Sequence, residues 1–313
     1  MITDFIYVLA GLASLYFGGE TLITGSLRIA HRFKISPFVI GATVMGFGTS
    51  SPELAVSVLA SFQGAAEVAV GNVIGSNIAN VGLVLGLTAL IVPLTIDQRR
   101  FKSEAFPLLI ASFLILFLAW DFSLSRWEGL LLLAGLLIYI WKTLKNDEAS
   151  DFELGEESPL FAGKGMGYQI VLTLAGLALL ILGAKWMVHG AVNIAREVGI
   201  SEWLIGISIV ALGTSLPEIV SSLLSARRGH GEMALGNIFG SNIFNIFMVL
   251  GATASLYPLN IQEAIHPDLL ITTGLTCLLL ILIRLEHQLS KHDGIILLLC
   301  YFSYIGLKGM GTI

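Results

Sequence analysis

Two motifs occur twice in this chain, and all four copies lie in long apolar segments. The first motif reads GFGTSSPE, ending at Glu53, and recurs as ALGTSLPE, ending at Glu218. The second reads GNVIGSNIAN, ending at Asn80, and recurs as GNIFGSNIFN, ending at Asn245. Both recurrences fall 165 residues after the first copy, and the surrounding sequence matches at the same offset. The constant offset indicates an internal duplication, so the fold must be built from two related halves.

The composition is that of a membrane protein. Of the 313 residues, 55% are hydrophobic and only 12% are charged, with a mean hydropathy of +0.85. Soluble globular domains carry about 25% charged residues. The net charge of −5 argues against nucleic acid as a partner. These values indicate a polytopic protein whose surface lies against the lipid bilayer.

Apolar segments long enough to cross a bilayer follow one another along the chain. A hydrocarbon core ~30 Å thick needs about 20 apolar residues per helix. By this criterion ten transmembrane helices are predicted, at about 4–27, 36–62, 67–93, 103–120, 128–144, 167–190, 202–226, 232–257, 268–284 and 294–310. The sequence therefore predicts an all-α integral membrane protein with a five-helix repeat at 1–145, an acidic linker at 146–166 and a second five-helix repeat at 167–313.

An odd number of spans per half places the second repeat in the opposite orientation to the first. In a ten-span arrangement, 13 of the 17 Lys and Arg residues fall in or beside loops on one side. The positive-inside rule makes that side cytoplasmic, so the linker is expected inside the cell and both termini outside. Basic residues also change places between the halves, because Arg28 corresponds to Asn193 whereas Gln63 corresponds to Arg228. We therefore expect an inverted-topology repeat, as in many secondary transporters.

Glu53 and Glu218 are carboxylates inside predicted spans. A charged side chain at the bilayer centre costs roughly 2.5–3.5 kcal/mol on insertion scales, so intramembrane carboxylates mark functional sites. Pro52 and Pro217 lack an N–H and clash with the carbonyl four residues earlier, so each helix is expected to break just before its carboxylate. Irregular backbone at membrane depth is tolerated where it lines a cavity or is buried in protein. The motifs thus predict a cation site between two broken helices.

The second motif adds uncharged oxygen ligands. Ser76 and Asn80 are four residues apart, as are Ser241 and Asn245, so each pair shares one helix face. Carboxylates, hydroxyls, amides and free carbonyls are hard donors that suit Ca²⁺ and Na⁺, and no Cys or His accompanies them. Two carboxylates would neutralise one Ca²⁺.

Several polar residues in these spans also have a structural interpretation. The glycines of the second motif serve equally well in close helix packing. Asn72, Asn77 and their counterparts in the second half are interpreted as interhelical hydrogen-bonding residues in preference to ligands. Glu20 lies near the centre of the first span, but its counterpart is Lys185, so a symmetric site does not explain it.

At these motifs the sequence resembles the Ca²⁺:cation antiporter superfamily, in its prokaryotic Na⁺/Ca²⁺ exchanger branch. Regions 36–86 and 201–251 resemble that family's paired α-repeats, and the resemblance covers nearly the whole chain. It implies four adjoining subsites, one preferring Ca²⁺ and the others open to Na⁺, and sliding of the first and sixth helices across the core. The ion ligands that it implies are Glu53, Glu218, Thr49, Ser50, Ser76, Asn80, Thr214, Ser215, Ser241, Asn245 and the backbone carbonyls of Gly46 and Ala211.

Two positions depart from the family pattern. Ser51 stands where Leu, Ala or Val is usual, and its hydroxyl either joins the site or packs. Asn245 stands where some relatives, including the K⁺-dependent exchangers, carry Asp. With Asn at both 80 and 245 the site has no third carboxylate, so K⁺-independent transport is predicted. The GNAAE-like motif of proton-coupled relatives is absent.

The sequence therefore predicts a secondary antiporter that exchanges Na⁺ for Ca²⁺ across the cytoplasmic membrane by alternating access. Its partners are the two ions and the bilayer; no enzymatic activity, no cofactor and no protein partner is implied. If three Na⁺ exchange for one Ca²⁺, as the resemblance suggests, transport is electrogenic. Ca²⁺/H⁺ antiport remains an open alternative, because protons also compete for carboxylates. A Ca²⁺ channel fits less well, since it would use a ring of acids in an oligomer, and a hydrolase would need a nucleophile–base pair.

Overall fold

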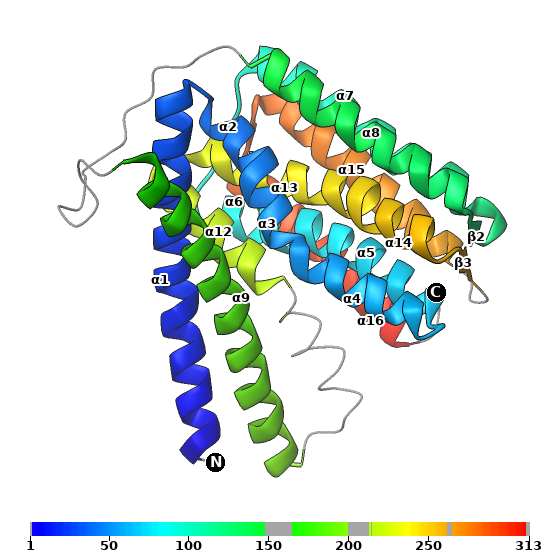
Figure 1. Cartoon of the computed structure of the whole chain (residues 1–313), viewed down its shortest axis with the longest axis horizontal. Helices are drawn as coiled ribbons and strands as arrows, with labels where there is room; N and C mark the ends of the chain where they lie inside the picture. The colour runs from blue at the N-terminus through cyan, green and yellow to red at the C-terminus, as the bar shows by residue number, and fades with distance from the viewer. Residues whose placement is uncertain (1, 148–164, 200–212, 214, 262–264, 311–313) are drawn as a thin grey trace.

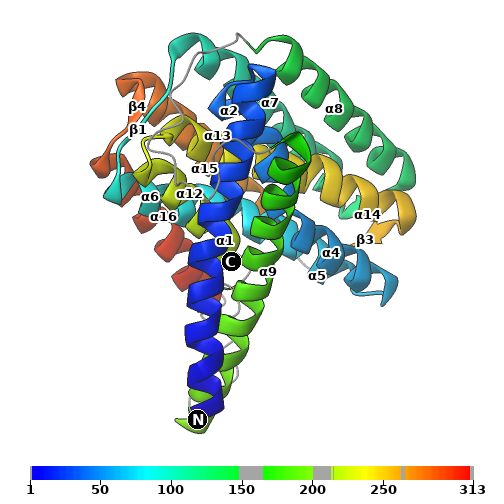
Figure 2. The same ribbon diagram turned by 60° about the vertical axis from the view of Figure 1, so that its left-hand side comes forward.

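Two long helices stand beside a larger helical body. The computed structural model describes residues 2–147, 165–199, 213, 215–261 and 265–310. Within them, α1 (Ile2–Phe33) and α9 (Met166–Glu197) run side by side, and their lower halves project from the body (Figures 1 and 2). The pair is antiparallel, because the amide of Asn193 donates a hydrogen bond to the carboxylate of Asp4 (2.9 Å) at the projecting end.

The contact between α1 and α9 depends on glycine. A methyl group at Gly18 would lie 2.8 Å from the backbone nitrogen of Leu180, and one at Gly176 would lie 2.4 Å from that of Leu22. Carbon atoms do not approach backbone this closely, so the two helices touch along a seam where side chains are missing. Methyl groups would be 2.5–2.8 Å from the neighbouring helix at four further positions: Gly11, Gly25, Gly183 and Gly190.

The body contains two series of short helices, one from each half of the chain. The first series is α2 (Pro37–Ile40), the π-helix η1 (Gly41–Met45), α3 (Gly46–Thr49), α4 (Ser51–Phe62), α5 (Ala66–Ala79), the π-helix η2 (Asn80–Leu85) and α6 (Gly86–Ile91). The second is α12 (Leu216–Arg227), α13 (Gly231–Phe244), the π-helix η5 (Asn245–Leu250) and α14 (Gly251–Leu256). The elements from α12 to α14 match those from α4 to α6 in order and length. All residues of both η2 and η5 are buried, so these segments lie in the core.

Four helices cover this core: α7 (Gln98–Leu118), α8 (Arg126–Lys145), α15 (His266–Glu286) and α16 (Lys291–Gly309); a short 3-10 turn, η3 (Ala119–Asp121), follows α7. Both α8 and α16 begin with a capping box, at Ser125 with Glu128 and at Ser290 with Asp293, which satisfies first-turn N–H groups. The repeated sequence therefore produces the same helix start twice.

Four strands of two residues each, which the sequence did not predict, join the two halves. β1 (Leu94–Thr95) pairs antiparallel with β4 (Gln288–Leu289), and β2 (Ser123–Leu124) pairs with β3 (Leu259–Asn260). β1 and β3 are equivalent in the two halves, as are β2 and β4, so the same pairing occurs twice. The 21-residue helix α15 runs from β3 to β4. At 1.5 Å per residue the two pairs therefore lie roughly 30 Å apart, at opposite ends of the body.

Polar contacts gather several loops at the β1–β4 end. The carboxylate of Asp147 accepts hydrogen bonds from the backbone N–H of Ser36 (2.8 Å) and from Arg100 (3.2 Å). Arg100 also approaches Glu232 (3.9 Å). The loops before α2, α7 and α13 and the end of α8 therefore meet at one end of the molecule. These loops carry much of the basic charge that the sequence assigned to one side.

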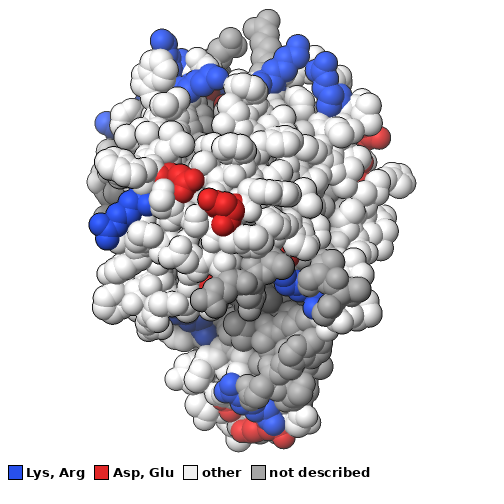
Figure 3. Space-filling view, turned by 90° about the vertical axis from the view of Figure 1, so that its right-hand side faces the viewer, with Lys and Arg blue, Asp and Glu red and all other residues white. Residues whose placement is uncertain are grey.

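Seven helices in the described part of the chain are long and apolar enough to cross a membrane. The predicted span at 36–62 is not among them because its helix is interrupted at Ser50. The span at 202–226 lies partly outside the described residues. α16 is charged at both ends, with Lys291 and Lys308, which lowers its mean hydropathy. On the face in Figure 3, uncharged side chains cover most of the surface and the charged ones form separate groups.

Because of the glycine seam between α1 and α9, we expect a glycine-to-alanine substitution to lower the stability of the protein at Gly176 and to raise it at Gly274. Gly176→Ala forces a methyl group against α1, and overpacking of this kind costs about 1–3 kcal/mol. At Gly274, inside α15, a methyl group meets no atom within 4 Å. Gly274→Ala should therefore raise stability by up to about 1 kcal/mol through helix propensity. Thermal unfolding in detergent should show a lower Tm for the first variant and an equal or higher Tm for the second; equal destabilisation would contradict this packing.

Candidate cation-binding site

The helix that carries the first carboxylate is interrupted directly before it. α3 ends at Thr49 and α4 begins at Ser51, with Ser50 between them in a turn conformation (φ −82°, ψ −2°). Pro52 lies in the first turn of α4, so it donates no hydrogen bond to the carbonyl of Gly48. The predicted break is confirmed in the first motif. In the second motif α12 begins immediately after Ser215 and also has its proline in the first turn.

The two carboxylates lie deep in the body, near each other. Glu53 is 2% exposed and Glu218 is 1% exposed. They are close enough to interact electrostatically. One oxygen of each, Oε2, has no hydrogen-bond partner among the described residues. Leaving a buried carboxylate oxygen without a partner is costly, so these oxygens are candidates for binding a cation or a proton.

Hydroxyl groups of the first motif contact the second motif of the other half. The Thr49 hydroxyl lies 3.1 Å from the hydroxyl of Ser241 and 3.5 Å from the Asn237 side-chain oxygen. The Ser50 hydroxyl donates to the carbonyl of Ser241 at 3.4 Å. The fold therefore brings together predicted ligands that lie about 190 residues apart in the chain.

Asn80 and Asn245 each occupy the first position of a π-helix, η2 and η5. π-Helical turns are rare and often lie at functional sites, because they change the direction of side chains and free backbone carbonyls. Both residues are buried, and the Oδ1 atom of each has no hydrogen-bond partner among the described residues. These two amide oxygens resemble the two carboxylate oxygens in being buried and available.

Of the remaining predicted ligands, three are described by the structure and two are not. Ser76 and Ser215 are buried, at 7% and 2% exposed. Gly46 is buried in α3, and its carbonyl accepts the N–H of Ser50 (3.1 Å), which leaves one lone pair. Thr214 and Ala211 lie outside the described residues.

Ser51 is directed away from these groups. Its hydroxyl donates to the carbonyl of Phe47 (2.8 Å), one helical turn earlier, on the exposed side of the helix. Of the two interpretations that the sequence left open, this bond favours a hydroxyl that satisfies the backbone of its own helix.

The asparagines interpreted as interhelical hydrogen-bonding residues have that role. Asn72 donates to the carbonyl of Glu53 (3.2 Å) and to the hydroxyl of Ser57 (3.0 Å), which ties α5 to the first turn of α4. Asn237 donates to two α12 serines, Ser221 at 3.1 Å and Ser222 at 3.0 Å. Sequence reasoning missed these three serines as supports; their signal was small polar residues three to four positions after each buried Glu.

The structure also explains the role of Glu20. Its carboxylate pairs with the guanidinium of Arg228, which follows α12, and the same guanidinium donates to the hydroxyl of Thr24 (2.9 Å). Glu20 therefore links α1 to the end of α12 and is not one of the buried site carboxylates. Its counterpart Lys185 has no such role because the counterpart of Arg228 is Gln63.

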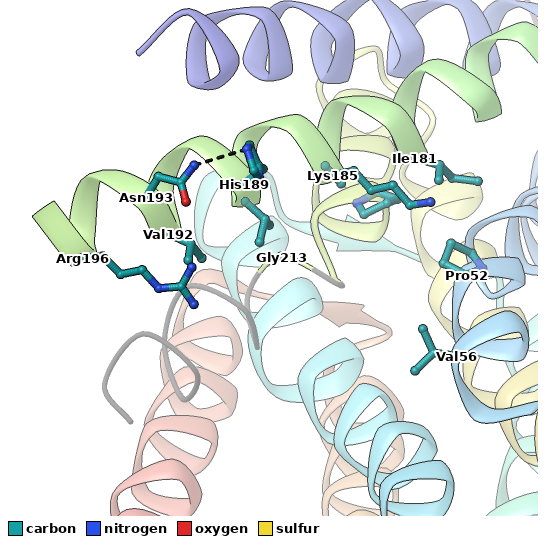
Figure 4. Close-up of a pocket in the computed structure, with 12 residues that line it drawn as sticks. Pro52, Val56, Ile181, Lys185, His189, Val192, Asn193, Arg196 and Gly213 are labelled. Atoms are coloured by element: carbon teal, nitrogen blue, oxygen red, sulfur yellow. Dashed lines mark hydrogen bonds between the residues drawn. The ribbon is translucent and has the colours of Figure 1, made fainter. Parts of the chain in front are cut away.

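A cavity of about 460 Å³ adjoins the site along α9, where Pro52, Val56 and Pro217 form part of the wall. In Figure 4, Lys185 extends from α9 toward Pro52, while Asn193 and His189 are hydrogen-bonded to each other. The described lining is mostly apolar and includes no carboxylate. It therefore does not supply the ligands that a cation needs.

The donor set fits a hard cation. No group of three or more His, Cys, Asp or Glu residues that could together hold a metal ion occurs in the part of the chain that the structure describes. The buried oxygens come instead from two carboxylates, two amides and several hydroxyls. This set suits Ca²⁺ or Na⁺ and does not suit soft or imidazole-preferring metals.

A helical membrane protein with this arrangement belongs to the class of cation transporters, and comparison with known proteins gives the family. The model of the family described as "Sodium/calcium exchanger protein" matches residues 3–145 and 168–310. The chain therefore belongs to the sodium/calcium exchanger protein family.

Individual relatives agree along their full length. The chain is 40% identical to a protein of Alkalimonas amylolytica named "Putative antiporter CaxA" and 32% identical to the sodium/calcium exchanger MaX1 of Methanosarcina acetivorans; each match covers 97% of this chain and 98% of the relative. Its fold is similar to a solved structure of the sodium-calcium exchanger NCX_Mj, with a TM-score of 0.85 and 37% identity over 97% of this chain and 98% of that one. Family and fold together make this a multi-pass membrane transporter of the exchanger type.

Adjacent serines provide a test of which groups line the site. Ser50→Ala removes a buried hydroxyl beside Ser241, whereas Ser51→Ala removes one that bonds only to Phe47. Loss of one neutral ligand is worth about 1 kcal/mol, which is roughly a fivefold change in affinity. Calorimetric titration with Ca²⁺ should therefore show weaker binding for Ser50→Ala and unchanged binding for Ser51→Ala. Weaker binding in the Ser51 variant alone would contradict the arrangement.

Proposed function

We propose that this protein is a secondary antiporter that exchanges Na⁺ for Ca²⁺ across the cytoplasmic membrane. The observation that carries the proposal is a set of four buried oxygens without hydrogen-bond partners among the described residues, one each on Glu53, Glu218, Asn80 and Asn245. The family and the relatives named above support it, because several of them are named exchangers of sodium and calcium.

The proposed ion ligands are those that the family resemblance implied. Two carboxylates match the charge of one Ca²⁺, and the neutral oxygens complete the six to eight ligands that this ion takes. Na⁺ competes for the same oxygens because it is also a hard cation. The full proposed set is Glu53, Glu218, Thr49, Ser50, Ser76, Asn80, Thr214, Ser215, Ser241, Asn245 and the carbonyls of Gly46 and Ala211.

For the architecture we propose ten transmembrane helices in two inverted five-helix repeats, with the acidic linker in the cytoplasm and both termini outside. Repeats at 1–145 and 167–313 are supported by the matched order of short helices and by the two equivalent strand pairs at opposite ends. The cytoplasmic assignment is supported by the basic loops that meet at the β1–β4 end.

Exchange by alternating access needs no covalent chemistry and therefore no cofactor. The α1–α9 pair is the proposed moving element, because its glycine seam packs the two helices together as one unit that projects from the body. With three Na⁺ bound the two carboxylates leave a net charge of +1, and with one Ca²⁺ they leave none. Such a cycle is electrogenic, at about 2.3 kcal/mol per net charge per 100 mV. Absence of a third carboxylate supports K⁺-independent exchange.

Ca²⁺/H⁺ antiport is the second candidate. The observation that favours it is the burial of Glu53 and Glu218 without a basic partner among the described residues, because a proton can neutralise a buried carboxylate as Na⁺ does. The flux experiment below separates the two.

Glu53→Gln and Glu218→Gln should each abolish Ca²⁺ transport while the protein still folds. Removing one charge from a buried ion site costs about 3 kcal/mol or more, which corresponds to roughly a hundredfold loss of affinity. Glu104→Gln is the matched control, because Glu104 is also buried, at 4% exposed, but lies on α7 beside Ser103. Its Ca²⁺ uptake in proteoliposomes should be retained; near-normal uptake in either site variant would refute the site.

The coupling ion is tested by radiolabelled Ca²⁺ uptake into proteoliposomes loaded with Na⁺ and diluted into Na⁺-free buffer. Uptake should require internal Na⁺, saturate with Ca²⁺ and proceed without added K⁺. Vesicles loaded with K⁺ or with acid are the controls. Uptake driven by the acid load in place of Na⁺ would be compatible with the proposed site but would assign the protein to the proton-coupled class. A requirement for K⁺ would overturn the proposed role of Asn245.

A further inference from the structure

The orientation of two side-chain amides decides whether they can bind a cation. An Asn side chain has an oxygen end, which ligates cations, and an NH₂ end, which only donates hydrogen bonds. Asn80 and Asn245 serve the proposed site only if Oδ1 is the end that faces it. This inference rests on the proposed function, and it concerns the groups that hold these amides in place.

A backbone carbonyl fixes the first of these orientations through Asn77. The Nδ2 of Asn77 donates to the backbone carbonyl of Asn242 (3.2 Å), which can only accept. The Oδ1 of Asn77 is therefore on the opposite side, where it accepts a hydrogen bond from Nδ2 of Asn245 (3.0 Å). Because Asn245 uses its NH₂ end here, its Oδ1 points the other way and is the buried atom without a described partner.

The second amide bonds to the equivalent residue of the other half, Asn242. Nδ2 of Asn80 donates to Oδ1 of Asn242 (3.1 Å), and Oδ1 of Asn80 is again buried without a described partner. The four side chains are 0–2% exposed, so bulk water cannot replace these bonds. Turning either amide would place two NH₂ groups or two oxygens against each other in a buried setting, which costs the full desolvation of both groups.

We propose that Asn77 and Asn242 are positioning residues that hold the oxygen ends of Asn245 and Asn80, respectively, toward the cation site. Each precedes a ligand asparagine of its own repeat by three residues, yet it orients the ligand of the other repeat. The two halves therefore complete each other's ligand sets.

The test combines an alanine substitution at each positioning residue with an aspartate substitution at each of the two ligand positions. In Asn77→Ala, Asn245 is free to turn, so Ca²⁺ affinity in the full-length protein should fall about tenfold in calorimetric titration. Adding Asn245→Asp should restore affinity, because both ends of a carboxylate are oxygens. Adding Asn80→Asp introduces the same charge beside an intact Asn242 and should not restore it. Conversely, Asn242→Ala should be rescued by Asn80→Asp and not by Asn245→Asp.

The pattern of rescue separates positioning from packing. Loss of affinity in both alanine variants with rescue only by the partnered aspartate supports the proposal. Wild-type affinity in Asn77→Ala, or equal rescue by both aspartates, overturns it while leaving the proposed function intact. Failure of the wild type to bind Ca²⁺ overturns both. If Asn77→Ala does not fold, as judged by its Tm without ions, Asn77→Ser replaces it and the Asn242 series gives the same comparison.

Discussion

Two buried carboxylates that interact electrostatically impose the main constraint on this structure. Glu53 and Glu218 are almost completely inaccessible, and each retains an oxygen without a partner in the described residues. Ionised groups in such surroundings repel each other and lose hydration, so they need cations or protons to be stable. The helix breaks before Glu53, the hydroxyls of Thr49 and Ser50 contact Ser241 of the opposite half, and the amide oxygens of Asn80 and Asn245 are buried without a described partner.

The two halves of the chain build this centre by interlocking. Thr49 and Ser50 of one half contact Ser241 of the other, and the asparagines of the second motif bond crosswise. Each half also pairs with the other at the ends of the body, where β1 pairs with β4 and β2 with β3. Neither half contains a complete donor set. The proposed ion site lies at this interface between the halves, and the α1–α9 pair proposed to move stands beside it.

Much of the fold was predictable from local sequence. Helices occur in each predicted span that the structure describes, and Pro52 marked the break at Ser50 because proline removes a hydrogen-bond donor wherever it stands. The π-helices beginning at Asn80 and Asn245 were not predicted, because apolar sequence around them reads as ordinary helix and the extra residue per turn is imposed by packing. The short strands escaped prediction because two residues carry no periodicity, and their partners lie over 130 residues away.

The sequence by itself determined the membrane environment, the duplication and the chemical inventory of the site, because these follow from composition, spacing and residue type. It could not determine the direction in which each side chain points. Ser50 and Ser51 are neighbours of the same type, yet only Ser50 faces Ser241, since backbone geometry at the break turns them apart. The ion pair between Glu20 and Arg228 could not be predicted, because it depends on the tertiary contact between α1 and the end of α12. The tertiary structure decided which end of the Asn245 amide is left without a described partner, because its NH₂ end donates to Asn77, a residue of the other half of the chain.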